Sequence, residues 1–419
     1  MPGLKVLIVG ASIAGPTAAY WFAKSGAKVT VIERFPKLRT TGQNVDIRTV
    51  GVTVMRKMPG LEEAVRAKRA PMAGMSFVGS DGRPYGVIEP TGNPDQQALI
   101  SEYEIFRGDL GKILYDMTKD NENIRYVFGE QVASMRQQGD GSITVEFLNG
   151  YPTADFDLVV ACDGSTSRTR AIGFECGVRD HIRPTNSWAA YFSLPRDILD
   201  GIQIGQAYSA VGGRTLAVGP DPAGGNRVML MGVQPRNDDT VMQPFREAVK
   251  LGDEATKRFV ALHYKGMGWK CDEVLKGMIE ADDFYASEIV QVKVPTLYKG
   301  RFALVGDAGY APGPTGNGTS LAMSGAYLLA GEIAKHKGDL AAGLRGYEER
   351  MLPIIKDLQK IPPLVPAIFA PYTAWGLWLR NTVFMIICWT GVINFAQKHF
   401  ASGFAEADTY QLPEYEWEA

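Results

Sequence analysis

The residues with the clearest chemical meaning are two glycines near the start of the chain, in Gly10-Ala-Ser-Ile-Ala-Gly15. Glycines at both ends of such a turn let backbone N–H groups approach a pyrophosphate, and a helix that begins there favours its negative charge. Glu33 follows 18 residues later, where a carboxylate can accept hydrogen bonds from ribose hydroxyls. We interpret the segment as a dinucleotide site for an unphosphorylated ribose, as in NAD or FAD. Its predicted contacts are Gly10, Ser12, Ile13, Ala14, Gly15 and Glu33.

Ser12 stands where the usual fingerprint has its central glycine, and it is small enough to keep the approach to the phosphates open. A tight turn without a ligand is the alternative interpretation of this segment. Two later aspartates help to decide between them.

Both aspartates follow short apolar runs that are typical of buried strands. Asp163-Gly164 follow residues 158–161, with Arg168 shortly after, and Gly306-Asp307 follow residues 302–305. An Asp-Gly turn alone is common, so a plain turn explains Asp163 equally well. The carboxylate of Asp307 can accept a hydroxyl, and the turn after it leads to a helix whose first N–H groups favour negative charge. Pro312, Gly316, Asn317 and Gly318 belong to that turn.

The elements that must position these residues are predicted from the apolar pattern. Residues 5–9 (KVLIV) and 28–33 (KVTVIE) read as strands, with a helix over 16–25 between them, so the chain opens with a βαβ unit. The stretch 187–289 has alternating apolar residues and many turns, which is typical of a separate sheet. The sequence therefore predicts an α/β fold with a Rossmann-like nucleotide-binding domain and an inserted substrate domain. The ranges are 1–180 and 291–350 for the nucleotide-binding domain and 181–290 for the substrate domain.

The last part, 351–419, is expected to form a C-terminal helical segment that packs on both domains. It is rich in proline at first and then has no charged residue from 381 to 397. A spanning helix needs ~20 apolar residues, and Asn381, Asn394 and Gln397 interrupt this run. We expect a buried helix that bridges the two domains; an interfacial membrane contact is the alternative.

Together, the three segments around Gly10, Asp163 and Asp307 resemble the group A, single-component FAD-dependent monooxygenases, the para-hydroxybenzoate hydroxylase type. The motif sequences GASIAG and GDAGYAPGPTGNG are most similar to those of the tetracycline-inactivating and salicylate-hydroxylase-like members. The resemblance extends from residue 5 to about residue 346 and keeps the order of the three motifs. It implies FAD as the cofactor, NADPH or NADH as the reductant, and O2 with a small aromatic or polyketide-like molecule as substrates.

The resemblance also implies roles for single residues. Arg107 would contact the FAD, Asp163 and Arg168 would serve the FAD and the nicotinamide cofactor, and Asp307 would bind the ribityl chain. Pro312 would lie beside the flavin ring, which also makes it a substrate-lining candidate. The remaining expected cofactor contacts are Arg34, Gln43, Asp46, Arg48, Gly306, Gly316, Asn317 and Gly318.

Some of these assignments have plain alternatives. Arg34 is equally well explained as a surface arginine, and Gln43, Asp46 and Arg48 as an ordinary polar loop. Tyr191 and Arg214 are candidate substrate-lining residues in the predicted second sheet.

In the family, a flavin C4a-hydroperoxide transfers one oxygen atom to the substrate, so we nominate no side-chain nucleophile. Epoxidation, Baeyer–Villiger insertion, and a flavin reductase or oxidase without oxygen transfer remain alternatives. A flavin-dependent halogenase is disfavoured because the sequence has no WxWxIP segment, and a non-enzymatic binding module would leave the nucleotide motifs unexplained.

Bulk properties narrow the remaining classes. The 419 residues carry a net charge of −2, so the chain lacks the excess positive charge that attracts the phosphates of nucleic acid. The four cysteines and four histidines are scattered, so no metal site or disulfide framework is expected. We expect a cytoplasmic protein, either a monomer or a homodimer.

Overall fold

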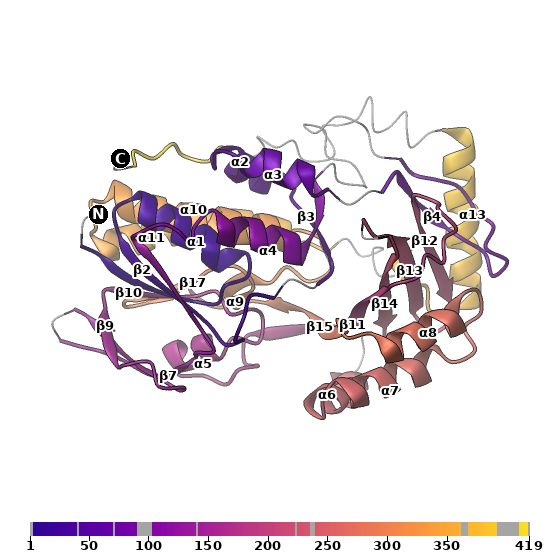
Figure 1. Cartoon of the computed structure of the whole chain (residues 1–419), viewed down its shortest axis with the longest axis horizontal. Helices are drawn as coiled ribbons and strands as arrows, with labels where there is room; N and C mark the ends of the chain where they lie inside the picture. Colours follow the sequence, from indigo (N-terminus) through magenta and orange to yellow (C-terminus); the bar gives the residue numbers. More distant parts are fainter. Residues whose placement is uncertain are drawn as a thin grey trace.

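Two large sheets organise the chain in the computed structural model, which describes residues 3–39, 42–69, 72–89, 103–139, 141–222, 224–234, 239–361, 368–391 and 410–417. The sheets lie at opposite ends of an elongated molecule (Figure 1). Two long strands, β11 (Ile182–Leu194) and β15 (Tyr285–Val292), run between the two ends.

The first sheet has six strands, in the order β16-β17-β10-β1-β2-β6. All neighbouring pairs are parallel except β16 with β17. Its central strands are buried on both faces, as expected for short runs of β-branched residues in a parallel sheet. The bounds are β1 Lys5–Val9, β2 Lys28–Glu33, β6 Ile124–Phe128, β10 Leu158–Ala161, β16 Tyr298–Lys299 and β17 Phe302–Leu304.

Helices cover one face of this sheet and a small antiparallel sheet covers the other (Figure 1). The expected βαβ unit is present, with α1 between β1 and β2. The helices on the first face are α1 Ala14–Lys24, α2 Val50–Arg56, α3 Leu61–Ala67, α4 Arg107–Asp116, α10 Gly318–Lys335 and α11 Leu340–Leu358. The second face carries β7 Val132–Gln137, β8 Ile143–Phe147, β9 Ala154–Phe156 and the short helix α5 Arg168–Phe174.

The second sheet has the order β15-β11-β14-β13-β12-β4 and is antiparallel except where β4 joins β12. Three helices pack on one of its faces around a core that contains Trp188 and Phe245. The strands are β4 Gly74–Phe77, β12 Ile204–Ala210, β13 Arg214–Pro220 and β14 Asn226–Val233, and the helices are α6 Gln243–Lys250, α7 Asp253–Tyr264 and α8 Cys271–Glu280. The predicted range 181–290 thus omits β4, which reaches this sheet from the first part of the chain.

The C-terminal segment contacts both ends of the molecule through different residues. Helix α13 (Ala374–Thr390) lies along the outer edge of the second sheet, whereas Tyr415 and Trp417 pack against α10 and α1. The expectation of a buried helix is wrong for α13, because none of its residues is buried. Its contacts with the second sheet include β12. Residues 392–397, the end of the uncharged run, lie outside the described residues. Among the described residues, no helix has the length and apolar character needed to cross a membrane.

Candidate functional site

The three nucleotide-binding motifs meet at one edge of the first sheet. β10 lies between β1 and β17, and Ala161 pairs with both Val9 and Leu304. Because the three strands are parallel, their carboxyl ends bring Gly10, Asp163 and Gly306 to the same edge. Ligands of open α/β sheets bind at this kind of edge.

The first turn is too tight for any residue but glycine at two positions. Gly10 has φ +110°, and a Cβ atom there would lie 2.6 Å from the Cys162 carbonyl oxygen. A Cβ atom at Gly15 would lie only 1.8 Å from the Gly10 carbonyl oxygen. The Glu33 carboxylate closes the turn from β2 by accepting from the Ala11 N–H at 2.9 Å. No side chain caps the start of α1, so its first N–H groups suit an anion.

Asp307 begins the short helix α9 (Asp307–Tyr310) and its side chain is exposed to solvent. Burial among the surrounding protein atoms nevertheless raises the pKa of this carboxyl, and the Arg107 guanidinium opposes that rise. A Cβ atom at Gly318 would lie 3.8 Å from Asp307 Oδ1, which places the start of α10 beside it.

The Asp163 carboxylate is already occupied by its own loop. It accepts hydrogen bonds from the Ser167 hydroxyl and from the Thr169 hydroxyl at 2.8 Å, and burial raises its pKa. Arg168 is exposed. Asp163 therefore holds the shape of the turn, and a direct contact of Asp163 or Arg168 with a cofactor stays a prediction.

Sequence reasoning missed Arg170, which is completely buried between two of the motifs. Its guanidinium donates to the carbonyl oxygens of Ala308 at 2.7 Å, Ser165 at 3.0 Å and Val178 at 2.8 Å. It thereby ties the Asp163 loop to α9. The only signal in the sequence is a second arginine, two positions after Arg168.

A two-stranded ribbon places the predicted loop residues beside the glycine-rich turn. Its strands are β3 (Asn44–Asp46) and β5 (Glu104–Phe106). Arg48 pairs with Asp46 at 2.8 Å, and the Arg48 N–H donates to Ser320 Oγ of α10 at 2.9 Å. A Cβ atom at Gly316 would lie 3.8 Å from Asp46 Oδ2. The structure thus brings Asp46, Arg48 and Gly316 together, as predicted for one site.

Gln43 and Glu104 add polar groups to the same region. The Gln43 carbonyl accepts from the Arg107 N–H at 2.9 Å, while its buried side-chain oxygen has no hydrogen-bond partner among the residues that the structure describes. Glu104 lies opposite Asp46 on the ribbon, and burial together with the Asp46 charge raises its pKa to about 7. Sequence reasoning missed Glu104 because the pairing of β3 with β5 joins distant segments.

The remaining predicted cofactor contacts interact with neighbouring residues of the protein. Asn317 donates to the Leu358 carbonyl at 3.3 Å, and the Pro312 carbonyl accepts from the Gln291 side chain at 3.0 Å. The guanidinium of Arg34, which is exposed, lies 4.8 Å from the centre of the Phe35 ring.

One face of the second sheet is directed toward the nucleotide-binding domain, and Tyr191 lies on that face. Tyr191 pairs with Tyr285 and with Met229, so these three side chains share the face opposite α6–α8. The Arg39 guanidinium lies 4.9 Å from the Tyr285 ring centre, which joins the segment after β2 to this face.

Arg214 does not accompany Tyr191, so the expectation that both line one substrate site is wrong. Arg214 pairs with Gly232, which also pairs with Trp188, so Arg214 lies on the helix-covered face. There its guanidinium donates to the carbonyl oxygens of Val211 and His263. The period of two along a strand puts residues 191 and 214 on opposite faces in this register.

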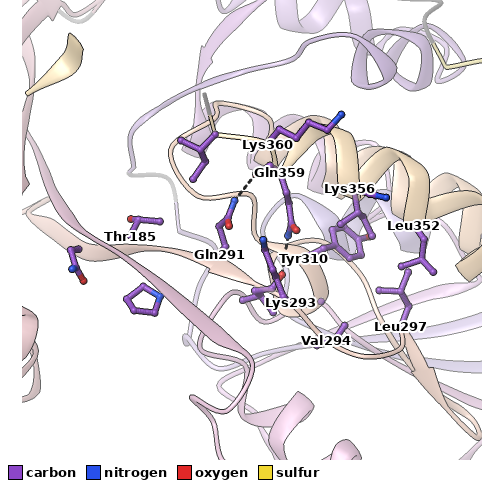
Figure 2. Close-up of a pocket in the computed structure, with 16 residues that line it drawn as sticks. Thr185, Gln291, Lys293, Val294, Leu297, Tyr310, Leu352, Lys356, Gln359 and Lys360 are labelled. Carbon is purple, nitrogen blue, oxygen red and sulfur yellow. Dashed lines mark hydrogen bonds between the residues drawn. The ribbon is translucent and has the colours of Figure 1, made fainter. Parts of the chain in front are cut away.

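A pocket of about 720 Å³ lies on the far side of the Pro312 turn, where β11, β15 and the end of α11 meet (Figure 2). Gln291 and Gln359 form part of its wall, and the Gln291 side-chain amide donates to the backbone carbonyl of Gln359 at 2.6 Å. Gln359 also donates to the carbonyl oxygens of Val292 and Ala311. The two amides therefore support the turn from behind. No group of three or more potential metal ligands occurs among the described residues.

The fold and the site define a nucleotide-cofactor protein with a second, sheet-based domain facing the cofactor edge. The sequence matches the family described as "FAD binding domain" over residues 3–360, and the chain belongs to this family. It is 36% identical over 411 residues to FAD-dependent monooxygenase asL4 of Sarocladium schorii, covering 92% of this chain and 93% of that protein. It is 33% identical to Monooxygenase CTB7 of Cercospora beticola, covering 99% and 98%.

Solved structures agree with this assignment. Tetracycline destructase Tet(51) superposes with a TM-score of 0.77 at 27% identity, covering 98% of this chain and all of that one. Klebsiella pneumoniae HpxO complexed with FAD and uric acid gives a TM-score of 0.70 at 19% identity over 95% and 97% of the chains, which shows the shared fold. The predicted resemblance to the single-component flavoprotein monooxygenases is confirmed, as are the α/β fold class and the flavoprotein assignment.

The residues at the cofactor edge fit FAD. The uncapped start of α1 suits a pyrophosphate, and Glu33 lies at the end of β2 for the adenosine ribose. The solvent-exposed Asp307 carboxylate and the unpartnered Gln43 oxygen supply acceptors further along.

Proposed function

We propose that this chain uses NAD(P)H and O2 to hydroxylate a small aromatic or polyketide-like substrate, with FAD bound along the edge where β1, β10 and β17 end. The observation that carries the proposal is the convergence of Gly10, Asp163 and Asp307 opposite the Tyr191 face of a second sheet. When bound, FAD supplies the redox chemistry and the activation of oxygen.

The residues of this chain bind and orient the reactants. The α1 N-terminus and Glu33 hold the adenosine diphosphate end of the cofactor, and Asp307 accepts from its ribityl chain. Helix α10 begins after Asn317 without a side-chain cap, and the N–H groups of its first turn favour negative charge on the nearby edge of the flavin ring. Arg48 and Asp46, which are paired with each other, border this place and are the candidates to contact the substrate.

The second sheet supplies an apolar wall that excludes water from the reacting centre. Tyr191, Met229 and Tyr285 form this wall, and burial raises the pKa of the Tyr191 hydroxyl, which further disfavours its ionised form. Water exclusion matters because it prevents the activated oxygen from being lost as H2O2. The substrate class follows the names of the relatives, which include tetracycline destructases.

The visible spectrum of the purified protein tests the cofactor, and NADH and NADPH oxidation with H2O2 detection tests the reaction. We expect flavin absorption bands and oxidation that phenolic or polyketide substrates stimulate with little peroxide release. Substrate-independent oxidation that returns all O2 as H2O2 would favour an oxidase. A colourless protein that FAD does not reconstitute would refute the proposal.

A further inference from the structure

The outer face of α13 carries more of the exposed large hydrophobic side chains than any other helix that the structure describes. Trp375, Trp378 and Trp389 are 68%, 58% and 87% exposed. At ~150–250 Å² for each aromatic side chain, the three tryptophans alone present about 500 Å². A monomer rarely leaves so large a contiguous patch uncovered. The aliphatic residues that extend this outer face are Leu379, Val383, Met385 and Ile386.

The opposite face of α13 is fixed on the second sheet, so the exposed face is not a consequence of a loose helix. The Phe384 ring packs edge-on against Phe77 of β4, with the centres 5.0 Å apart. The Arg380 guanidinium lies 3.8 Å from the centre of the Phe77 ring and donates to the Ile368 carbonyl. A Cβ atom at Gly86 would lie 2.4 Å from Cys388, which shows how closely the two segments approach.

The charge of this segment argues against a lipid surface. Arg380 is the one charged residue between residues 368 and 391, and its guanidinium is turned inward onto Phe77. Helices that lie in a membrane interface carry lysines and arginines beside the apolar face to bind anionic headgroups. The outer face of α13 has none, whereas tryptophan and methionine with few charges are typical of the centre of a protein interface.

The exposed side chains are also arranged symmetrically along the helix, with Thr382 at the centre. A two-fold axis at Thr382 would place two antiparallel copies of α13 with six of the exposed apolar side chains in opposing pairs, whereas Val383 would lie opposite Asn381. Residues 375 and 389 are about 21 Å apart at 1.5 Å rise per residue, so the contact would extend along most of the helix. The pairs equidistant from Thr382 are Trp375 with Trp389, Trp378 with Ile386, and Leu379 with Met385.

We propose that the outer face of α13 binds the same face of a second copy of this chain, with the two helices antiparallel and the two-fold axis at Thr382. Symmetric dimers bury one self-complementary patch from each copy. A standard interface buries about 800 Å² per partner. The tryptophans and the aliphatic residues beside them bring the patch to that scale.

Sedimentation velocity of the FAD-loaded protein, across micromolar concentrations, tests the proposal. We expect a dimer for the natural chain and a monomer for the double variant Trp378→Glu with Ile386→Glu, whose dissociation constant should rise roughly 100-fold or more. The matched control is Leu251→Glu with Leu262→Glu, which places two acids on exposed apolar positions of another surface and should leave the dimer intact. Flavin content and the far-ultraviolet circular dichroism of every variant verify that it is folded.

Thiol crosslinking tests the axis. Thr382→Cys should give a covalent dimer with a short bis-maleimide, at a yield well above that of the natural chain with its own cysteines. Leu262→Cys on α7 should not. A natural chain that sediments as a monomer at these concentrations would overturn the proposal. If that monomer also floats with phosphatidylcholine vesicles, a lipid surface is the occupant instead.

Discussion

Glycine can be required at a position for its backbone freedom or for the space that a missing side chain leaves. Replacing Gly15 by alanine tests the second requirement alone. The φ angle of Gly15 is not positive, so alanine can adopt its backbone conformation. The added Cβ atom would however lie 1.8 Å from the Gly10 carbonyl oxygen and 3.0 Å from the Gly10 carbonyl carbon. Real Cβ contacts are essentially never shorter than 3.0 Å, so α1 must move away from the end of β1 by more than an ångström.

That movement displaces the N–H groups at the start of α1 from the pyrophosphate. Hydrogen bonds to a charged group contribute about 1.5–3 kcal/mol each, so the loss of one raises the FAD dissociation constant roughly 10-fold to 150-fold. The overpacking itself costs about 1–3 kcal/mol of stability. We expect protein that purifies with little flavin and melts at a lower temperature than the natural chain.

Titration of the apoprotein with FAD, followed by quenching of flavin fluorescence, measures the effect. Gly219→Ala is the matched control, because a Cβ atom at Gly219 meets nothing within 4 Å and its φ is also not positive. If Gly15→Ala binds FAD within two-fold of the Gly219→Ala control, the pyrophosphate does not lie at this turn and the placement of the cofactor is refuted.

Three further changes probe the same edge. Asp307→Asn should weaken FAD binding at least about 10-fold by removing a charged acceptor; an unchanged affinity in the same titration would contradict the role of this carboxylate. Arg170→Met should destabilise the fold by about 3–5 kcal/mol, because three carbonyl oxygens lose a buried charged donor, whereas the exposed Arg168→Met should barely change the calorimetric melting temperature. Burial and then the Asp46 charge raise the pKa of Glu104 to about 7. Because this pKa lies above the ordinary value of 4.5, ionisation of Glu104 opposes folding as pH rises from 4.5 through 7. Glu104→Gln should therefore gain melting temperature relative to the natural chain between about pH 5 and pH 8, and an equal difference at both pH values would contradict it.

Local pattern was enough to predict β1, β2, β10 and β17 of the first sheet and the motifs that follow them, but not β6 or β16. The run KVLIV before Gly10 and the run FALV before Gly306 are short, apolar and β-branched or bulky, and each ends in glycine, so strand and turn are both specified within a few residues. The convergence of the three motifs followed from the family resemblance and is explained by the parallel order β1-β10-β17.

The failures all concern partners that are distant in sequence. β4 joins the second sheet by pairing with β12, more than a hundred residues later, and no local signal indicates that choice. The face that Arg214 occupies depends on its register with Gly232 and Trp188. Arg170 gains its importance from the carbonyl of Ala308. α13 was expected to be buried because it is apolar, yet composition does not say whether the covering surface belongs to the same chain.

The strand order of the first sheet has a consequence for how the protein is made. β1 and β2 are synthesised first, but β10 follows only at residue 158 and β17 only at residue 302, after the second sheet has been synthesised. One edge of β1 therefore has no partner strand on the nascent chain until β10 is made, and one edge of β10 has none until β17 is made. The apolar face of α1 waits even longer, for α10. Unpaired strand edges of this kind favour aggregation during slow, non-local folding. Ribosomal pausing between the two halves, or a shortage of chaperones, should therefore reduce the yield of this chain more than that of a protein whose sheet is built from consecutive strands.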